Sequence, residues 1–316
     1  MYSFRRIPSR SPRGSPCTKL TSTTVSTGGK GCDVRDVAGR EPGPVLVRHP
    51  AHPGLRGMVA GMVGYREDTT RRVVRRQPAG SLIPLVVSFG PRLEILDLSH
   101  GTGLGPKESF VVGLMPGHAT TAFASSQHCL QVYLTPLGAA RLLDAPAASI
   151  ASSVVDLADV IPAFDEGFRE RLWAARSWDR RFEVMDRALL QRLAGSESAD
   201  PMVAWMWHQI DRSRGTARIS ALVRETGLSH RHVSSRFKQT IGATPKVAAA
   251  VVRFEWAAQA LHRASIADVA AAYGYADQSH LIREFRRFSG ETPTQLREAR
   301  RPTAHTALGA VTDDAF

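Results

Sequence analysis

The distribution of apolar and polar positions divides the chain into segments with different expected secondary structure. Between residues 57 and 135, short runs rich in β-branched and aromatic residues alternate with Gly, Pro and polar turns, which is typical of antiparallel strands. About six strands are expected there, in the stretches GMVAGMVGYRED, SLIPLVVSFG, LEILDL, SFVVGL and HCLQVYLTP. We therefore predict a small β-barrel or a sandwich in this part of the chain.

Helical spacing follows the strands. The stretch LGAARLLDAP predicts a short helix that ends at its proline, and residues 164–193 predict a long helix. Within the long helix, apolar side chains recur every three or four residues, at Phe182, Met185, Leu189 and Leu193, and so form a stripe on one face. This stripe packs either on the β-rich part of the same protomer or on a second subunit, and the sequence favours neither.

Three segments lack apolar periodicity. Residues 1–44 are rich in Ser, Arg, Pro, Thr and Gly, and this segment and residues 302–316 are predicted to be disordered tails because they bury too little apolar surface to offset the entropy of ordering. An organelle transit peptide and an over-extended reading frame are the alternatives for the first tail. The polar residues 196–201 predict a linker, which leaves a β-rich domain at 45–195 and a helical domain at 202–301.

The charge is distributed unevenly between these segments. The formal net charge is +12. Residues 1–40 contribute +6, residues 41–200 zero, residues 201–301 +8 and residues 302–316, with Asp313 and Asp314, −2. A uniformly soluble surface would not predict so uneven a distribution. A basic domain joined to a neutral one indicates binding of a polyanion that is coupled to a second activity.

Several classes of protein are not expected. No apolar run approaches the length of a membrane-spanning helix. Cys17, Cys32 and Cys129 form no CxxC pair, which argues against a disulfide framework and a zinc site and fits a reducing cytoplasm. Cys129 is expected in the core. His118 and His128 lack the HxH…E pattern of a metal-binding barrel, so no metal or other cofactor is expected. Motifs of nucleophilic or phosphate-binding enzymes are also missing, and the chain is predicted not to be an enzyme.

The helical domain contains an internal repeat. Segment 219–245 aligns with segment 266–293, at an offset of 47 residues before a central turn and 48 after it. The matched positions are Ile219 and Ile266, Gly227 and Gly274, Phe237 and Phe285, Gly242 and Gly290, and Pro245 and Pro293. Two copies of one pattern make a chance match much less probable than one copy would.

Each copy predicts two helices joined by a tight turn. The first helix ends at Gly227 or Gly274, where a left-handed residue is needed. Ser229 and Asp277 are placed to cap the second helices. Each second helix also has an apolar pair, four residues apart, that is expected to face the core; the pairs are Val233 with Phe237, and Leu281 with Phe285.

The outward positions of the two second helices carry short polar, hydrogen-bonding and cationic side chains. Such side chains suit a helix that contacts base edges and phosphates in the major groove. The candidate DNA-binding residues are His230, Arg231, Ser234, Ser235, Lys238, Ser279, His280, Ile282, Arg283, Arg286 and Arg287.

These candidates differ in the contact that we expect. Arg283 and then Arg231 are the best candidates for base contacts, and the alternative for both is a contact to phosphate alone. The cations Lys238, Arg286 and Arg287 are predicted to bind phosphate, with a solvated face as the alternative. For His230 and His280, a surface position without a role in DNA binding is the alternative.

Three groups of residues in this region form a combined pattern. The first copy contains Leu228, Ser229, Phe237, Gly242 and Pro245, and the connecting helix contains Arg253, Ala257 and Leu261. The second copy contains Ile266, Ala270, Gly274, Tyr275, Asp277, Gln278, Ser279, Phe285, Gly290, Pro293 and Arg297. With this pattern, residues 216–297, about a quarter of the chain, resemble the DNA-binding domain of AraC-type transcriptional regulators.

The resemblance implies two helix-turn-helix units, joined by a helix, whose recognition helices enter neighbouring segments of the major groove. Arg253 is expected to join the connecting helix to the fold rather than to contact DNA. Arg231 is followed by Ser234 and Ser235, where the family often has larger or amide-bearing side chains, and this departure leaves the operator sequence open. Residues 45–195 resemble, more loosely, the sensor domains of such regulators, which implies a cupin-like β-barrel with helices for dimerisation.

The sequence therefore predicts an α+β protein with an N-terminal β-barrel and an all-α C-terminal domain. Its predicted function is that of a cytoplasmic, sequence-specific transcription regulator that binds double-stranded operator DNA and is gated by a small-molecule effector or by dimerisation. RNA polymerase and a second copy of the chain are possible partners. An architectural DNA-binding protein without ligand control is the alternative, and an enzyme fused to a DNA-binding domain is disfavoured because no reactive cysteine cluster is present.

Overall fold

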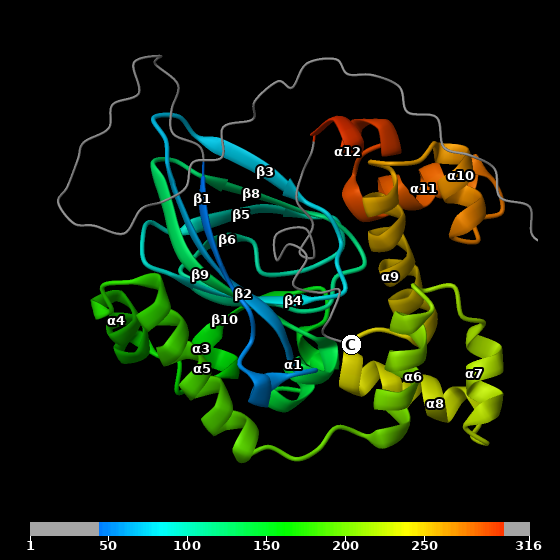
Figure 1. Cartoon of the computed structure of the whole chain (residues 1–316), viewed down its shortest axis with the longest axis horizontal. Coiled ribbons are helices and arrows are strands. Elements are labelled where there is room, and N and C mark those ends of the chain that lie inside the picture. The colour runs from blue at the N-terminus through cyan, green and yellow to red at the C-terminus, as the bar shows by residue number, and fades with distance from the viewer. Residues whose placement is uncertain (1–43, 300–316) are drawn as a thin grey trace, which may run out of the picture. The chain divides into compact units, whose positions relative to one another are not determined.

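Ten strands form two antiparallel sheets in the computed structural model, which describes residues 44–299 (Figure 1). The two predicted tails lie outside the described residues, apart from Pro44. The larger sheet has the order β1 (Val45–His49), β2 (Val59–Asp68), β9 (Ser126–Leu134), β4 (Ile83–Ser88), β7 (Ser109–Val112) and β10 (Val154–Asp156). The smaller sheet has the order β3 (Val73–Gln77), β8 (Ala119–Phe123), β5 (Leu93–Leu98) and β6 (Gly105–Lys107).

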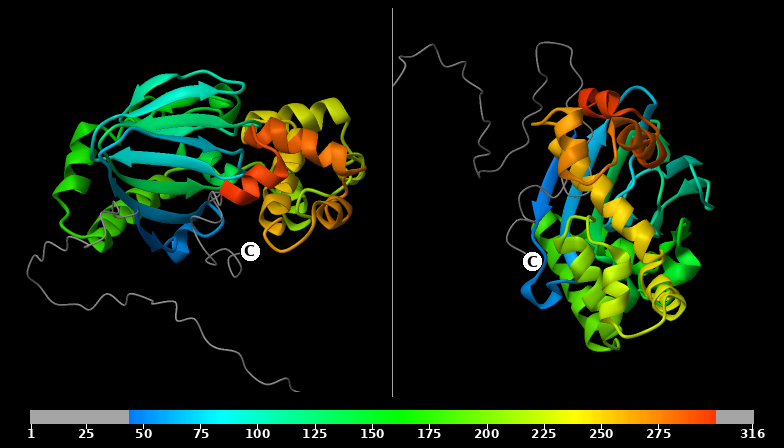
Figure 2. Two further views of the ribbon diagram at one scale, coloured as in Figure 1. Left: turned by 90° about the horizontal axis from the view of Figure 1, so that it is seen from above. Right: turned by 90° about the vertical axis from the view of Figure 1, so that its right-hand side faces the viewer.

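The two sheets face each other as layers and do not close into a barrel (Figure 2). Among the described strands, none of one sheet pairs with a strand of the other. The β-rich character of this part is confirmed. Of the two predicted alternatives, the closed barrel was wrong and the open, two-layered sandwich is observed, with more strands than expected. Closure depends on pairing between edge strands, which the alternation of apolar residues within a strand does not determine.

The larger sheet has two differently packed faces, as strand β9 shows. Leu130, Val132 and Leu134 belong to a core that includes residues of the helices on one side of the sheet. Cys129, the residue just before Leu130, points to the opposite face of the strand and belongs to a second core that includes residues of both sheets. Cys129 is fully buried, as predicted, and burial raises the pKa of its thiol to about 12.

The predicted long helix is two helices, α4 (Glu166–Ala174) and α5 (Trp178–Ala194). The prediction of one continuous helix was wrong because Ser177 is extended and caps α5 by accepting a hydrogen bond from the Arg180 amide. The spacing of apolar residues alone does not reveal a break between two consecutive helices. The remaining short helices of this part are η1 (Pro53–Leu55), α1 (Pro136–Leu142), α2 (Ala147–Ile150) and α3 (Leu157–Val160).

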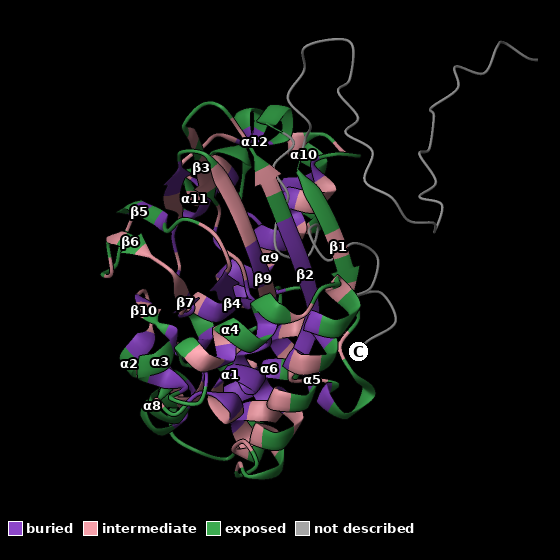
Figure 3. Ribbon diagram, turned by 90° about the vertical axis from the view of Figure 1, so that its left-hand side faces the viewer, coloured by how far each residue is buried: buried purple, intermediate pink, exposed green. Residues whose placement is uncertain are grey.

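The apolar stripe of α5 packs inside the protomer. Phe182, Met185 and Leu189 are almost completely buried in the same core as the strands of the larger sheet, while other positions of α5 are exposed (Figure 3). Gly64 of β2 permits this packing, because a Cβ atom there would lie 2.4 Å from the Trp178 ring. The sequence left open whether this stripe packs on the β-rich part of the same protomer or on a second subunit. In the structure it packs on the β-rich part of the same chain.

Seven helices follow the sheets in the described residues: α6 (Pro201–Arg212), α7 (Ile219–Glu225), α8 (His230–Ile241), α9 (Pro245–Ala260), α10 (Ile266–Ala272), α11 (Gln278–Ser289) and α12 (Pro293–Ala299). They confirm the predicted α+β class. Asp200 caps α6 through the amides of Met202 and Val203, so the proposed linker at 196–201 ends in a helix cap. None of the helices described is both long and apolar enough to span a membrane.

Replacing Phe182 with Ala should lower the free energy of unfolding by about 3–5 kcal/mol, because the substitution leaves a cavity in the core beneath the sheet. Denaturant titration would measure the loss, with the exposed Gln191→Ala on the same helix as the control. The loss should not depend on protein concentration. A dependence on concentration would instead indicate that the stripe belongs to a subunit interface.

Candidate nucleic-acid interface

Helices α7 and α8 form the first of two similar units. Gly227 ends the first helix of the unit with a φ of +67°, in the left-handed region that favours glycine. Ser229 then accepts a hydrogen bond from the His232 amide and caps α8. Val233 and Phe237 are fully buried. The predicted turn, cap and core pair of the first unit are therefore confirmed.

Helices α10 and α11 repeat this arrangement. Gly274 has a φ of +68°, and the Asp277 carboxylate accepts a hydrogen bond from the His280 amide at 2.6 Å. Leu281 and Phe285 are fully buried. The turn, cap and core pair of the second unit are confirmed as well.

The second turn is one residue longer than the first. Residues 226–229 join α7 to α8, whereas residues 273–277 join α10 to α11, which explains why the offset of the repeat changes from 47 to 48. The longer turn places the Tyr275 ring in the core of the second unit, 6% exposed, while Leu228 in the first turn is 42% exposed. The two units are thus similar but not equivalent.

Arg253 of the connecting helix α9 binds within the second unit. Its guanidinium donates to both carboxylate oxygens of Glu284, at 3.0 and 2.9 Å, and lies 4.8 Å from the centre of the Tyr275 ring. Burial alone would lower the pKa of Arg253, but the hydrogen bonds and charge of Glu284 raise it above its usual value. These contacts confirm the structural role that we expected for Arg253.

Equivalent positions of α8 and α11 form two exposed faces. In α8, Arg231, Ser235 and Lys238 are exposed, and their spacing of four and three residues places them on one face. In α11, the positions 48 residues later are Ser279, Arg283 and Arg286, which are also exposed. We call these six residues the paired polar faces. Among the described residues, no carboxylate forms an ion pair with a cation of these faces.

The other candidates differ in exposure. His230 and Arg287 are exposed, whereas Ser234 and Ile282 are partly buried. His280 is tied to its own unit, because its Nδ1 atom accepts a hydrogen bond from the Ala276 amide and its ring packs edge-on against Tyr275. His280 is therefore a weaker candidate for a DNA contact than its outward position suggested.

The sequence analysis did not assign Arg236, the remaining cation of α8. Its guanidinium forms an ion pair with Asp200 at 2.6 Å, on the side of α8 that faces away from the paired polar faces by its helical position. On the same helix, Val233 and Phe237 share a core with Leu114 and Leu137 of the sheet-rich part. The first unit is thus anchored to helix α1 and to the segment that follows β7.

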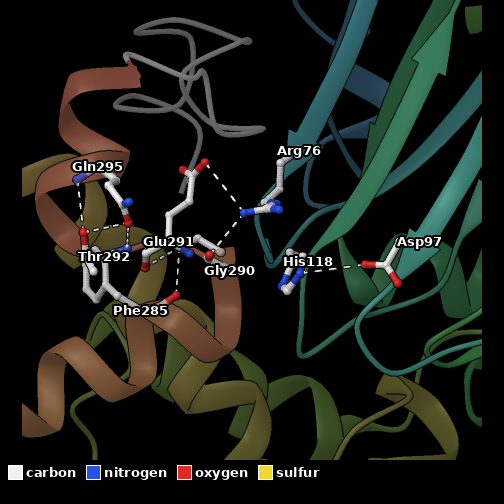
Figure 4. Close-up of polar contacts among 9 residues, drawn as sticks. Arg76, Asp97, His118, Phe285, Gly290, Glu291, Thr292 and Gln295 are labelled. Atoms are coloured by element: carbon white, nitrogen blue, oxygen red, sulfur yellow. Dashed lines mark hydrogen bonds and ion pairs between the residues drawn. The ribbon is translucent and has the colours of Figure 1, made fainter.

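The sheet-rich part also contacts the second unit, through residues 76–81, which comprise the end of β3 and most of the loop that leads to β4 (Figure 4). The Arg76 guanidinium donates to the Gly290 carbonyl at 3.1 Å and lies 4.0 Å from the Glu291 carboxylate. The Ala79 amide donates to the Phe288 carbonyl at 2.8 Å. We call residues 76–81 the connecting segment. Sequence patterns gave no sign of these contacts, because the partners lie more than 170 residues apart.

The connecting segment also holds the helix between the units. Both the amide and the hydroxyl of Ser81 donate to the Glu255 carboxylate, at 3.0 and 2.7 Å. Glu255 lies on α9 and is only 1% exposed. A buried carboxylate is costly without hydrogen-bond donors, so Ser81 stabilises the position of α9 against the sheet-rich part.

The two histidines that we considered as metal ligands lie in different places. His118 lies beside the second unit: a Cβ atom on Gly290 would be only 2.9 Å from the His118 ring. The Nε2 atom of His118 lies 3.9 Å from the Asp97 carboxylate (Figure 4). Burial and then the charge of Arg76 lower the pKa of His118. His128 contacts Phe89, Trp173 and Trp178. In residues 44–299, no group of three or more His, Cys, Asp or Glu side chains is arranged to hold a metal ion.

A cavity of about 550 Å³ lies between the two sheets. Its size is within the range of small-molecule sites, and its walls include Val86, Phe110 and Met115. Residues 76–80 of the connecting segment also line the cavity. The cavity could not be located from the sequence, because it results from the open arrangement of the sheets.

Comparison with known proteins identifies the helical part. Residues 222–299 match the family model described as a helix-turn-helix domain. Among solved structures, the C-terminal domain of AraT, a response regulator from Geobacillus stearothermophilus, is similar at 22% identity over 34% of this chain and 93% of that chain, with a TM-score of 0.31. ToxT from Vibrio cholerae is similar at 9% identity over 75% of this chain and 97% of that chain, with a TM-score of 0.44. No curated protein matches the chain in sequence.

The predicted resemblance is therefore confirmed for the helical part. It is a helix-turn-helix DNA-binding domain of the AraC type, with two units joined by α9.

Two substitutions on the paired polar faces should have different effects on binding to DNA. Arg283→Ala should weaken binding to a specific site by about 1–3 kcal/mol while sparing random DNA, because the substitution would remove the base contact that we predict for Arg283. Lys238→Ala should weaken binding to both DNAs alike and reduce the salt slope by about one, because the substitution would remove the phosphate contact that we predict for Lys238. Fluorescence anisotropy over a series of salt concentrations, on a duplex selected with the full chain, would measure both effects. An equal loss on random DNA for Arg283→Ala would contradict the base contact.

Proposed function

We propose that this protein is a sequence-specific transcription regulator whose sheet-rich part binds a small-molecule effector. The paired polar faces carry the first half of the proposal. They present hydrogen-bonding and cationic side chains at equivalent positions of two helices in an AraC-type domain. Cations without carboxylate partners are suited to phosphates and base edges. We propose double-stranded operator DNA as the partner of these faces.

The connecting segment carries the second half of the proposal. Residues 76–80 line the cavity, while Arg76, Ala79 and Ser81 hydrogen-bond to the second unit and to α9. An occupant of the cavity therefore contacts the same backbone that supports the second unit. If the occupant favours one arrangement of this segment, it changes the affinity for DNA by its difference in binding energy, typically 1–3 kcal/mol.

Other partners follow from this role. A regulator of this kind acts on the bacterial chromosome in the cytoplasm, and RNA polymerase is the natural partner for activation. A homodimer would have to use surfaces other than the stripe of α5, since Phe182, Met185 and Leu189 are buried within the protomer. An architectural DNA-binding protein would have no need of a cavity that borders the DNA-binding domain.

Genome-wide immunoprecipitation of the tagged protein, followed by sequencing of the bound DNA, tests the proposed function. We expect a small number of sharp peaks that share one sequence motif, because the two helix-turn-helix units select bases at neighbouring segments of the major groove. The Arg283→Ala variant is the matched control and should lose these peaks. Broad occupancy without a motif would overturn the proposal in favour of an architectural protein.

Replacing Arg76 with Ala should loosen the second unit without affecting the first. The substitution removes the hydrogen bond to Gly290 and the ion pair with Glu291, so amides of α11 and α12 should exchange with deuterium severalfold faster. Hydrogen exchange with mass spectrometry would show this, with α8 as the internal reference. Arg72→Ala, which removes an exposed ion pair with Glu94, is the control. Unchanged exchange in α11 and α12 would mean that the connecting segment does not support the second unit.

A further inference from the structure

We infer that the cavity between the sheets binds an uncharged ligand with a mainly apolar body and a hydrogen-bonding head. This inference rests on the proposed effector site and specifies the chemistry of its ligand.

The apolar body is indicated by the walls of the cavity. The larger sheet contributes Val86, Phe110 and Val154, and the smaller sheet contributes Leu93 and Ile95. These side chains belong to the core that includes residues of both sheets. A ligand that fills this space removes apolar surface from water on both sides. A sugar would leave most of its hydroxyl groups without partners against the same walls, which is unfavourable.

The charge of the ligand is set by the polar cluster of Arg75, Glu67 and Tyr65. Arg75 lines the cavity, but its guanidinium already donates to both carboxylate oxygens of Glu67, at 2.7 and 2.6 Å. The Tyr65 hydroxyl hydrogen-bonds to both partners. Burial, followed by the hydrogen bond to Glu67, raises the pKa of Tyr65 well above its usual value, so its hydroxyl remains neutral. The cluster therefore presents no net charge to the cavity.

An anionic ligand would have to compete with Glu67 for this guanidinium. The Glu67 side chain is only 11% exposed, so its displaced carboxylate would remain buried without a countercharge, which is strongly unfavourable. The two other arginines of the wall do not change this result. Arg76 is directed to the Gly290 carbonyl and to Glu291, and Arg48 is exposed on β1, where water screens its charge.

Neutral groups in the wall are suited to the head of the ligand. The Tyr133 hydroxyl donates to the Gln131 side chain at 2.7 Å, and both residues line the cavity. The Gln131 amide group has two hydrogens, of which one points to Cys129 at 3.4 Å, and the hydroxyl of Tyr133 retains acceptor capacity. Thr121 of the smaller sheet adds a hydroxyl. An amide, hydroxyl or carbonyl head would find both donors and acceptors here.

Three probes with the same alkyl chain test the charge of the ligand. Octanamide and 1-octanol are neutral, whereas octanoate is ionised at neutral pH. We expect calorimetric titration of the full chain, without DNA, to detect binding of both neutral probes and at least about tenfold weaker binding of octanoate. Equal or tighter binding of octanoate would overturn the inference, as would a failure of both neutral probes to bind.

Substitution of Glu67 tests the cause of this preference. Glu67→Gln leaves the Arg75 charge unbalanced, so octanoate should bind about tenfold more tightly than to the unaltered protein, while octanamide should change by no more than about twofold. Glu94→Gln, in the exposed ion pair with Arg72, is the matched control and should change neither. If octanoate binds Glu67→Gln no better, the Arg75–Glu67 pair does not set the charge of the ligand and the inference fails.

Two further variants keep the test decisive if Glu67→Gln folds poorly. The double substitution Glu67→Gln with Arg75→Gln removes both charges, and it should retain the preference for octanamide. Ala119→Phe places a ring in the cavity and should abolish binding of all three probes while the circular dichroism spectrum is preserved. Binding of octanamide that survives Ala119→Phe would place the ligand elsewhere and overturn the inference.

These titrations distinguish the ligand class from the proposed regulation, because they contain no DNA. Selective binding of the neutral probes with no change in DNA affinity would sustain the ligand class and refute the gating. Loss of the shared motif in the immunoprecipitation would refute the regulator and leave the titrations unaffected.

Discussion

The buried carboxylate of Glu255 is the contact on which the arrangement of the remaining elements depends. It lies on α9, the helix that joins the two helix-turn-helix units, and it accepts hydrogen bonds from the amide and hydroxyl of Ser81. Because a buried carboxylate tolerates little loss of its donors, α9 and the loop before β4 are held close together. The neighbouring Ala79 and Arg76 then meet the end of α11. One polar contact in the interior thus determines which part of the sheet-rich region faces the second unit.

The two units of the repeat are held to the sheet-rich part with different shares of apolar and hydrogen-bonding contacts. The first shares an apolar core with Leu114 and Leu137, and apolar contacts are not directional. The second has the Ala79 side chain of the connecting segment in its apolar core, and this six-residue segment also donates hydrogen bonds to the backbone of α11 and the residues that follow it. Hydrogen bonds depend steeply on distance and angle, so a small displacement of the connecting segment affects the second unit more than the first. The proposed regulation therefore acts asymmetrically on two units that the sequence presents as copies.

Local features of the DNA-binding domain could be predicted from the sequence because each depends on neighbouring residues. Gly274 and Asp277 define a turn and a cap by their own conformational and hydrogen-bonding preferences, and Arg283 is exposed because its helix has a regular apolar face. The break at Ser177 escaped prediction, because the apolar spacing continues through it. The placement of the eleven candidate residues on DNA stays a prediction.

Contacts between distant segments could not be predicted in this way. Ser81 and Glu255 are 174 residues apart, and neither has a feature that marks it in sequence as a partner of the other. The pairing of the strands into two open sheets also depends on edges rather than on the alternation within a strand. The cavity follows from that pairing, and so does the meeting of Arg75 on β3 with Glu67 on β2. The chemistry of the proposed ligand site was therefore hidden until the fold was known.

The distribution of charge in the fold gives the two proposed sites opposite requirements. Within residues 44–299, the cations of the paired polar faces have no carboxylate partners, as binding of a polyanion requires. The cavity wall instead matches the Arg75 guanidinium with the Glu67 carboxylate, so a neutral molecule can enter without disturbing the field at the DNA-binding faces. Under the proposed regulation, coupling must then pass through the connecting segment rather than through long-range charge. Linkage is reciprocal, so any factor by which a ligand changes the affinity for DNA is also the factor by which DNA changes the affinity for that ligand.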